Sequence, residues 1–73
     1  MEQTLVAVGS GFRQEILGEN LVDCLEVAYR LYRGHRVQLF TLEPIGYIDG
    51  TELVIEGGHV SQEVINKIMA QGS

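Results

Sequence analysis

A short basic stretch holds the side chains best suited to bind an anion or an acidic partner: Arg30, Arg33, His35 and Arg36. No acidic residue lies between Glu26 and Glu43, so positive charge is concentrated there. A second interpretation is that cations at the end of a helix complement its dipole and pair with Asp23 and Glu26 on the same face. If the stretch binds an anion or an acidic partner, these four residues are candidate partner-binding residues.

Cys24 and His59 carry the remaining reactive chemistry. Cys24 falls on the apolar side of a predicted helix, which indicates a buried structural thiol and not a nucleophile. His59 follows Gly57-Gly58 on an exposed turn, with no serine, cysteine or acid pair beside it in the sequence. Glu52 and Glu56 lie about 13 Å apart on one strand face, too far for a paired-carboxylate site. We therefore expect no catalytic and no metal-ligating residues, and a protein that is not an enzyme.

Gly9-Ser10-Gly11 ends an apolar run, as phosphate-binding loops do. A dinucleotide loop needs a third glycine where this chain has Gln14, and a P-loop needs a lysine followed by serine or threonine, which does not occur here. The three residues therefore predict a plain turn, and no cofactor is expected.

The distribution of charge argues against nucleic acid as a partner. The chain has a formal net charge of −5 at pH 7. Outside residues 30–36, its ten Asp and Glu residues face only Arg13 and Lys67, which leaves −8. General affinity for nucleic acid depends on cations that neutralise phosphates. We expect an acidic body with one small basic spot, and no nucleic-acid binding.

Length and composition indicate one small globular domain over residues 1–73. The chain is 45% hydrophobic and 21% charged, and a chain this short buries a marginal core. Its single cysteine forms no intrachain disulfide, so a second subunit is the expected source of extra stability. The start of the chain lacks the basic residues of a signal peptide, and no apolar run approaches the ~20 residues of a membrane span. We expect a cytoplasmic protein without membrane contact.

The predicted fold class is α+β, with a small three- to four-stranded sheet, two helices and the element order β-α-β-β-α. Residues 3–8 predict a strand because they are rich in β-branched side chains. Residues 12–18 stay ambiguous between a helical turn and a strand. Residues 36–42 predict a strand whose two faces are both substantially apolar.

Two helices are predicted from periodicity and capping residues. The first covers residues 21–33, where Asn20 can cap its start and Gly34 can end it in a left-handed conformation. The second covers residues 62–71, with Ser61 as its cap.

Asp49-Gly50 predicts a hairpin closed by a type I′ turn. A two-residue closure there gives the cross-strand pairs Ile48–Thr51, Tyr47–Glu52 and Gly46–Leu53. Leu53 and Ile55 then point into the core, and Pro44 implies an edge or a bulge in the first arm.

The helix over residues 21–33 carries more apolar surface than one sheet face can bury. The residues expected to pack on the sheet are Leu21, Leu25, Ala28 and Tyr32. The flank formed by Cys24, Val27 and Leu31 then needs the C-terminal helix or a second chain to cover it. We expect a homodimer, with these three residues as candidate partner-binding residues and Phe40 and Leu42 as further contributors to the seam.

These observations favour a small acidic binding protein that regulates or inhibits a protein partner without catalysis. Two alternatives stay open. The first is a small-molecule sensor or carrier with a pocket at a dimer interface. The second is a small enzyme whose composite site lies between subunits and involves His59 or the arginines.

Overall fold

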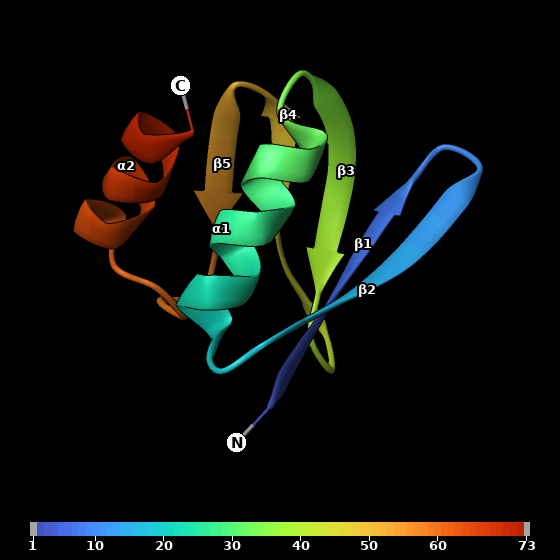
Figure 1. Cartoon of the computed structure of the whole chain (residues 1–73), viewed down its shortest axis with the longest axis horizontal. Coiled ribbons are helices and arrows are strands. Elements are labelled where there is room, and N and C mark those ends of the chain that lie inside the picture. Colours follow the sequence, from blue (N-terminus) through green and yellow to red (C-terminus); the bar gives the residue numbers. More distant parts are fainter. Residues whose placement is uncertain (1, 73) are drawn as a thin grey trace.

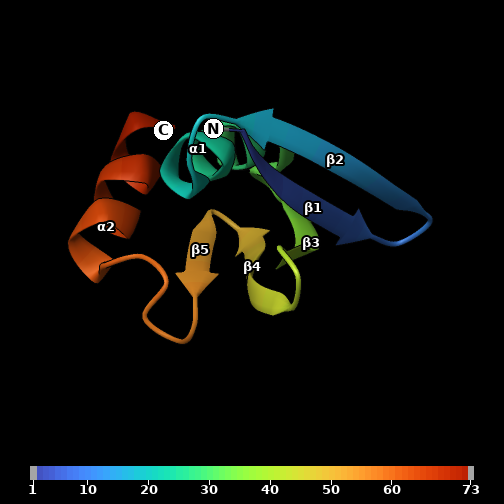
Figure 2. The same ribbon diagram turned by 90° about the horizontal axis from the view of Figure 1, so that it is seen from below.

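The β-branched residues at the start of the chain form a strand, and residues 12–18 form the strand that pairs with it. The computed structural model describes residues 2–72. Its elements, in chain order, are β1 (Gln3–Gly9), β2 (Phe12–Gly18), α1 (Leu21–Tyr32), β3 (His35–Phe40), β4 (Pro44–Gly50), β5 (Glu52–Ile55) and α2 (Gln62–Gln71). The strands form one antiparallel sheet in the order β2-β1-β3-β4-β5, and both helices lie on the same side of it (Figures 1 and 2).

The expected α+β class with two helices is confirmed, but the strand number and the element order are corrected. The sheet has five strands and the order is β-β-α-β-β-β-α. One reason is that residues 12–18 form β2, and the other is that residues 36–50 divide into β3 and β4. A register shift between Leu39 and Phe40 marks this division, and Pro44 begins β4 opposite Phe40. The predicted irregularity at Pro44 is therefore a bulge.

The Gly-Ser-Gly stretch is the plain turn that its sequence predicts. Gly9 pairs with Phe12, so Ser10-Gly11 is a two-residue connection between β1 and β2. Gly11 has a φ of +82°, a conformation that glycine adopts without the steric cost of a Cβ. The turn directs residues 12–18 back along β1, and this pairing makes them a strand.

Both helices begin at the predicted caps. The Asn20 side chain accepts a hydrogen bond from the Asp23 N–H at 3.0 Å, and Ser61 Oγ accepts one from the Val64 N–H at 3.3 Å. Helix α1 ends before Gly34, whose φ of +91° stops the helical path as expected.

The β4–β5 hairpin forms, but the predicted type I′ turn is wrong. Asp49 pairs with Glu52, so Gly50-Thr51 is the turn. The observed pairs are therefore Ile48–Leu53, Tyr47–Val54 and Gly46–Ile55. Gly50 has a φ of +65°, while no described non-glycine residue has a positive φ, so the left-handed residue stands first in the turn, as in type II′. Gly50 also pairs with His35 of β3, which holds it at the end of β4.

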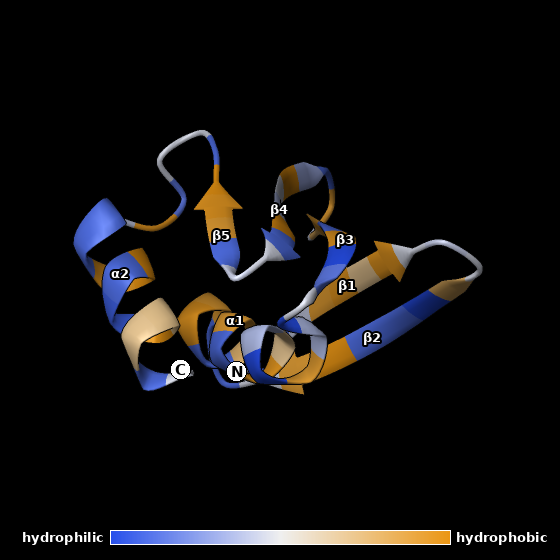
Figure 3. Cartoon of the chain, turned by 90° about the horizontal axis from the view of Figure 1, so that it is seen from above, coloured by the Kyte–Doolittle hydropathy of each residue, from blue (hydrophilic) through white to orange (hydrophobic). Residues whose placement is uncertain are grey.

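The core fills the space between the helices and one face of the sheet (Figure 3). Alternate strand residues point into it, and Leu53 is buried there while Ile55 packs against it, as predicted. Helix α2 packs beside α1 and β5. The Tyr29 hydroxyl of α1 donates a 2.6 Å hydrogen bond to the Thr51 carbonyl, which ties α1 to the β4–β5 turn. No helix within residues 2–72 is long and apolar enough to cross a membrane.

Candidate interaction surfaces

The basic stretch spans two elements and does not form a single patch. Its four members are all exposed and lie at the end of α1 or the start of β3: Arg30, Arg33, His35 and Arg36. Because Val37 of β3 is buried beneath the helices, its neighbour Arg36 points to the other side of the sheet. There the Arg36 Nη2 lies 3.6 Å from Oδ2 of Asp49. The ion pairs within residues 2–72 do not join an arginine to Asp23 or Glu26, so the expected pairing within the helix is not formed.

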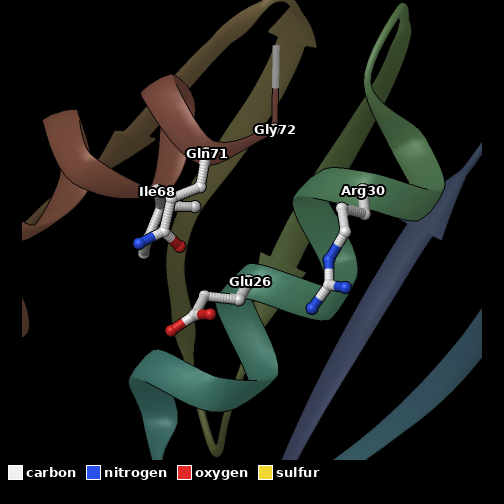
Figure 4. Close-up of a pocket in the computed structure, with 5 residues that line it drawn as sticks. All are labelled: Glu26, Arg30, Ile68, Gln71 and Gly72. Atoms are coloured by element: carbon white, nitrogen blue, oxygen red, sulfur yellow. The ribbon is translucent and has the colours of Figure 1, made fainter.

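Arg30 instead lines a hollow of about 270 Å³ between α1 and the end of α2 (Figure 4). The lining residues are Glu26, Arg30, Ile68, Gln71 and Gly72. The Glu26 carboxylate and the Arg30 guanidinium come from successive turns of α1, and Ile68 and Gln71 come from the facing side of α2. These five residues offer charge and hydrogen bonds but neither a thiol, a hydroxyl nor an imidazole. The hollow suits contact with a polar group.

Cys24 is fully buried and is therefore not a surface residue. Its Sγ lies 3.3 Å from the Gln3 carbonyl oxygen and 3.8 Å from that of Ile16. Burial raises the pKa of this thiol above its usual value, and the nearby Asp23 carboxylate adds to the rise, because both disfavour the thiolate. The predicted buried structural thiol is confirmed, and Cys24 is removed from the candidate partner-binding residues.

Val27 and Leu31 remain on the surface, with 36% and 53% of their areas exposed. Helix α2 does not cover them, because it packs on the opposite flank of α1 near Tyr29, whose ring lies against Gly72. Cys24, Val27 and Leu31 therefore have different surroundings. Cys24 lies against β1 and β2, while Val27 and Leu31 are exposed on the surface of α1.

His59 is exposed in the loop between β5 and α2, where sequence reasoning placed it. Gly57 and Gly58 both have a φ of +72°, so the loop depends on its two glycines. Within the described part of the chain, no group of three or more His, Cys, Asp or Glu residues is arranged to hold a metal ion.

The side of the sheet away from α1 and α2, here called the helix-free face, is a surface that sequence reasoning identified only in part (Figures 2 and 3). Its apolar centre runs across four strands and consists of Val6, Val8, Phe40, Tyr47 and Val54. Phe40 lies opposite Val6, and Tyr47 lies opposite both Gln38 and Val54. Tyr47 is 39% exposed, although it stands on a central strand.

Two ion pairs flank this apolar centre. On β2, Nη1 of Arg13 lies 3.5 Å from Oε1 of Glu15. On β3 and β4, Nη2 of Arg36 lies 3.6 Å from Oδ2 of Asp49. A shallow hollow of about 290 Å³ between them is lined by Val6, Val8, Arg13, Phe40 and Thr41. The helix-free face therefore combines exposed apolar and aromatic area with two pairs of opposite charges.

One sequence signal pointed to this face. The strand over residues 36–42 was predicted to be apolar on both sides, and Phe40 was assigned to a seam with another chain. Phe40 does lie on the helix-free face, whereas Leu42 follows β3 in a loop and is fully exposed. No protein-family profile, curated protein or solved structure matches this chain.

Proposed function

We propose that the chain is a small binding protein that regulates a protein partner, and that the helix-free face is the surface that binds it. The single observation that carries this proposal is the apolar centre of that face, which neither α1 nor α2 covers (Figure 2). Burial of such exposed apolar area against a partner is favourable by about 25 cal/mol per Å². A contiguous apolar patch on a small protein is typical of a protein-interaction site.

The charges of the helix-free face favour a protein over nucleic acid. A phosphate backbone needs cations that are free to pair with it. Here Arg13 and Arg36 already lie beside carboxylates, Glu15 and Asp49, on the same face. Tyr47 and Phe40 can pack against apolar side chains, and the charged rim can form hydrogen bonds and ion pairs with a partner surface of mixed charge. Aromatic residues surrounded by a polar rim are the usual composition of protein interfaces.

The regulatory action follows from binding alone in this proposal. A flat face that occupies a surface of its partner blocks access to that surface, so inhibition or allosteric control requires no chemical step. The proposed protein is therefore not an enzyme, and it needs no cofactor.

A capture experiment with matched lysine variants tests the proposal. Tyr47→Lys places a charge at the centre of the helix-free face, and Leu42→Lys places the same charge in an exposed loop outside it. We expect the wild type and Leu42→Lys to retain the same protein from a lysate of the source cells. This retention should resist nuclease treatment, and Tyr47→Lys should lose at least about 90% of it. Circular dichroism checks that both variants are folded.

Retention that is equal for all three proteins would contradict the assigned surface. Retention that disappears after nuclease treatment would contradict the class of partner. A thermal shift with a small metabolite that Tyr47→Lys abolishes would favour the sensor alternative.

A further inference from the structure

The two edges of the sheet differ in how much backbone they leave unpaired. Strand β5 has four residues, and α2 packs against it. Strand β2 has seven residues and stands at the opposite end of the sheet order. Figures 1 and 2 show the β1–β2 hairpin reaching away from the helices, with no other segment of residues 2–72 alongside its outer edge. A long unpaired edge is a template for another strand.

The hairpin register identifies the backbone groups at this edge. In an antiparallel pair, alternate residues exchange both hydrogen bonds with the partner strand. A two-residue turn is closed by such a pair, here Gly9 and Phe12. The residues two and four positions further along β2 therefore also bond to β1. The N–H and C=O groups of Arg13, Glu15 and Leu17 point outward instead, ready to accept and donate across the edge.

We propose that two copies of this chain join through their β2 edges, antiparallel and centred on Gln14, so that the two sheets become one. In this register Arg13 of each copy lies opposite the partner's Glu15, and each pair exchanges two backbone hydrogen bonds. Phe12 lies opposite the partner's Ile16 on the helix side. Shifting the centre by one residue places Arg13 opposite the partner's Arg13 or Glu15 opposite the partner's Glu15, and like charges directly opposite are destabilising. The charge pattern of β2 is thus complementary to itself in one register.

The exposed flank of α1 supports the same seam. Cys24 Sγ contacts the Ile16 carbonyl, which shows that α1 rests directly beside β2. Val27 and Leu31 follow Cys24 by three and seven residues, which places them on the same side of α1, and both are exposed. A strand added at the β2 edge, together with the helix packed on it, covers both residues. The seam therefore buries apolar area as well as pairing backbone.

This assembly joins the β2 edges, whereas the proposed function rests on the apolar centre of the helix-free face, so the assembly does not depend on that function. The two surfaces meet at Arg13 and Glu15, which flank the apolar centre and stand at the β2 edge. The helix-free faces of the two copies stay open and become continuous across the seam. The dimer would therefore present two copies of the partner-binding face side by side.

Cysteine cross-linking tests the register directly. Gln14 lies opposite the partner's Gln14 in a pair without hydrogen bonds, where Cα atoms are about 4.5 Å apart, within the range of a disulfide. We expect Gln14→Cys to form a covalent dimer nearly completely under mild oxidation. Gln38→Cys is the matched control, because Gln38 is an exposed strand glutamine in the middle of the sheet, and it should stay monomeric on denaturing gels. The native Cys24 is buried and does not compete.

Charge reversal tests the same seam without a covalent bond. Arg13→Glu makes both cross-seam pairs repulsive, so we expect the dimer Kd to rise at least about tenfold. Adding Glu15→Arg restores opposite charges in both pairs and should return the Kd to within about threefold of the wild-type value. Light scattering after size exclusion measures the mass, and the rescue separates a broken seam from a broken fold.

Three results would overturn the proposal. The first is a wild-type mass near 8 kDa at tens of micromolar. The second is equal cross-linking at positions 14 and 38, which would indicate packing of helix-free faces. The third is a dimer that Arg13→Glu leaves unchanged. None of these outcomes bears on whether Tyr47→Lys loses a partner from lysate, so the two proposals fail separately.

Discussion

Gly46 stands where β4 and β5 run too close for any side chain. A Cβ at this position would lie 2.0 Å from the Val54 carbonyl oxygen. Because that oxygen belongs to backbone in the sheet, it cannot move without parting the two strands. We expect Gly46→Ala to destabilise the protein by about 3 kcal/mol, the upper end of the cost of overpacking, as measured by urea denaturation.

Gly50 provides the matched control for this substitution. It has a φ of +65°, but nothing lies within 4 Å of the position of its Cβ. Gly50→Ala should therefore cost only the conformational strain of a positive φ, about 1 kcal/mol. Equal losses from the two variants would show that the close approach at Gly46 does not matter. A neutral Gly50→Ala would contradict the observed turn.

The buried Cys24 thiol predicts a specific dependence of stability on pH. Burial raises its folded-state pKa above the ordinary thiol value of 9.0, so the unfolded state loses the proton first as pH rises. The stabilising contribution is present below about pH 9 and is lost as pH rises through the folded-state pKa. The stability advantage of the wild type over Cys24→Ala should therefore shrink as pH rises above about 9. An advantage that stays constant over this range would contradict an enclosed thiol.

At the scale of elements, the caps of α1 and α2 predict measurable stability. The Asn20 side chain accepts from the Asp23 N–H at the start of α1. Asn20→Ala should cost about 1 kcal/mol in chemical denaturation, because an otherwise orphaned N–H loses its partner. Asn20→Asp retains a carbonyl-type acceptor and should cost little. If the two variants are equally destabilised, the loss does not come from the cap.

The helices could be predicted because their signals are local. Apolar periodicity, an Asn or Ser before the first turn and a glycine after the last turn all lie within a few residues of each other. Strand β2 could not be assigned in the same way, because Arg13, Gln14 and Glu15 interrupt its apolar pattern and only pairing with β1 fixes it. Long-range pairing also decided the β4–β5 register.

The surfaces were predicted less well than the elements for a related reason. The basic stretch is continuous in sequence, but strand alternation sends Arg36 to the helix-free face while Arg30 stays on α1 beside α2. The α1 flank of Cys24, Val27 and Leu31 was expected to need cover from α2 or a second chain, but the sheet itself covers Cys24 and only the other two stay exposed. The sequence did not show on which side of α1 the helix α2 would pack. Its C-terminal end packs against Tyr29, and Val27 and Leu31 stay exposed.

At the scale of the whole molecule, charge predicts no binding to duplex DNA. The formal net charge is −5, and two of the five basic residues, Arg13 and Arg36, lie beside carboxylates. Long-range repulsion should therefore oppose the approach of a phosphate backbone. A gel shift at physiological salt should show no complex up to tens of micromolar protein. A salt-sensitive complex in the micromolar range would contradict this expectation.

The surface that a partner contacts can be mapped on the whole molecule by amide resonances of the 15N-labelled protein. The amide chemical shifts of the labelled chain are compared, at the same concentration, in its free form and in complex with the partner captured from the lysate. We expect the largest shifts on the helix-free face, at Val6, Gln38 and Tyr47, and little change at the exposed Glu63 and Lys67 of α2. Shifts centred on Glu63 and Lys67, with those of Val6, Gln38 and Tyr47 unchanged, would contradict this expectation.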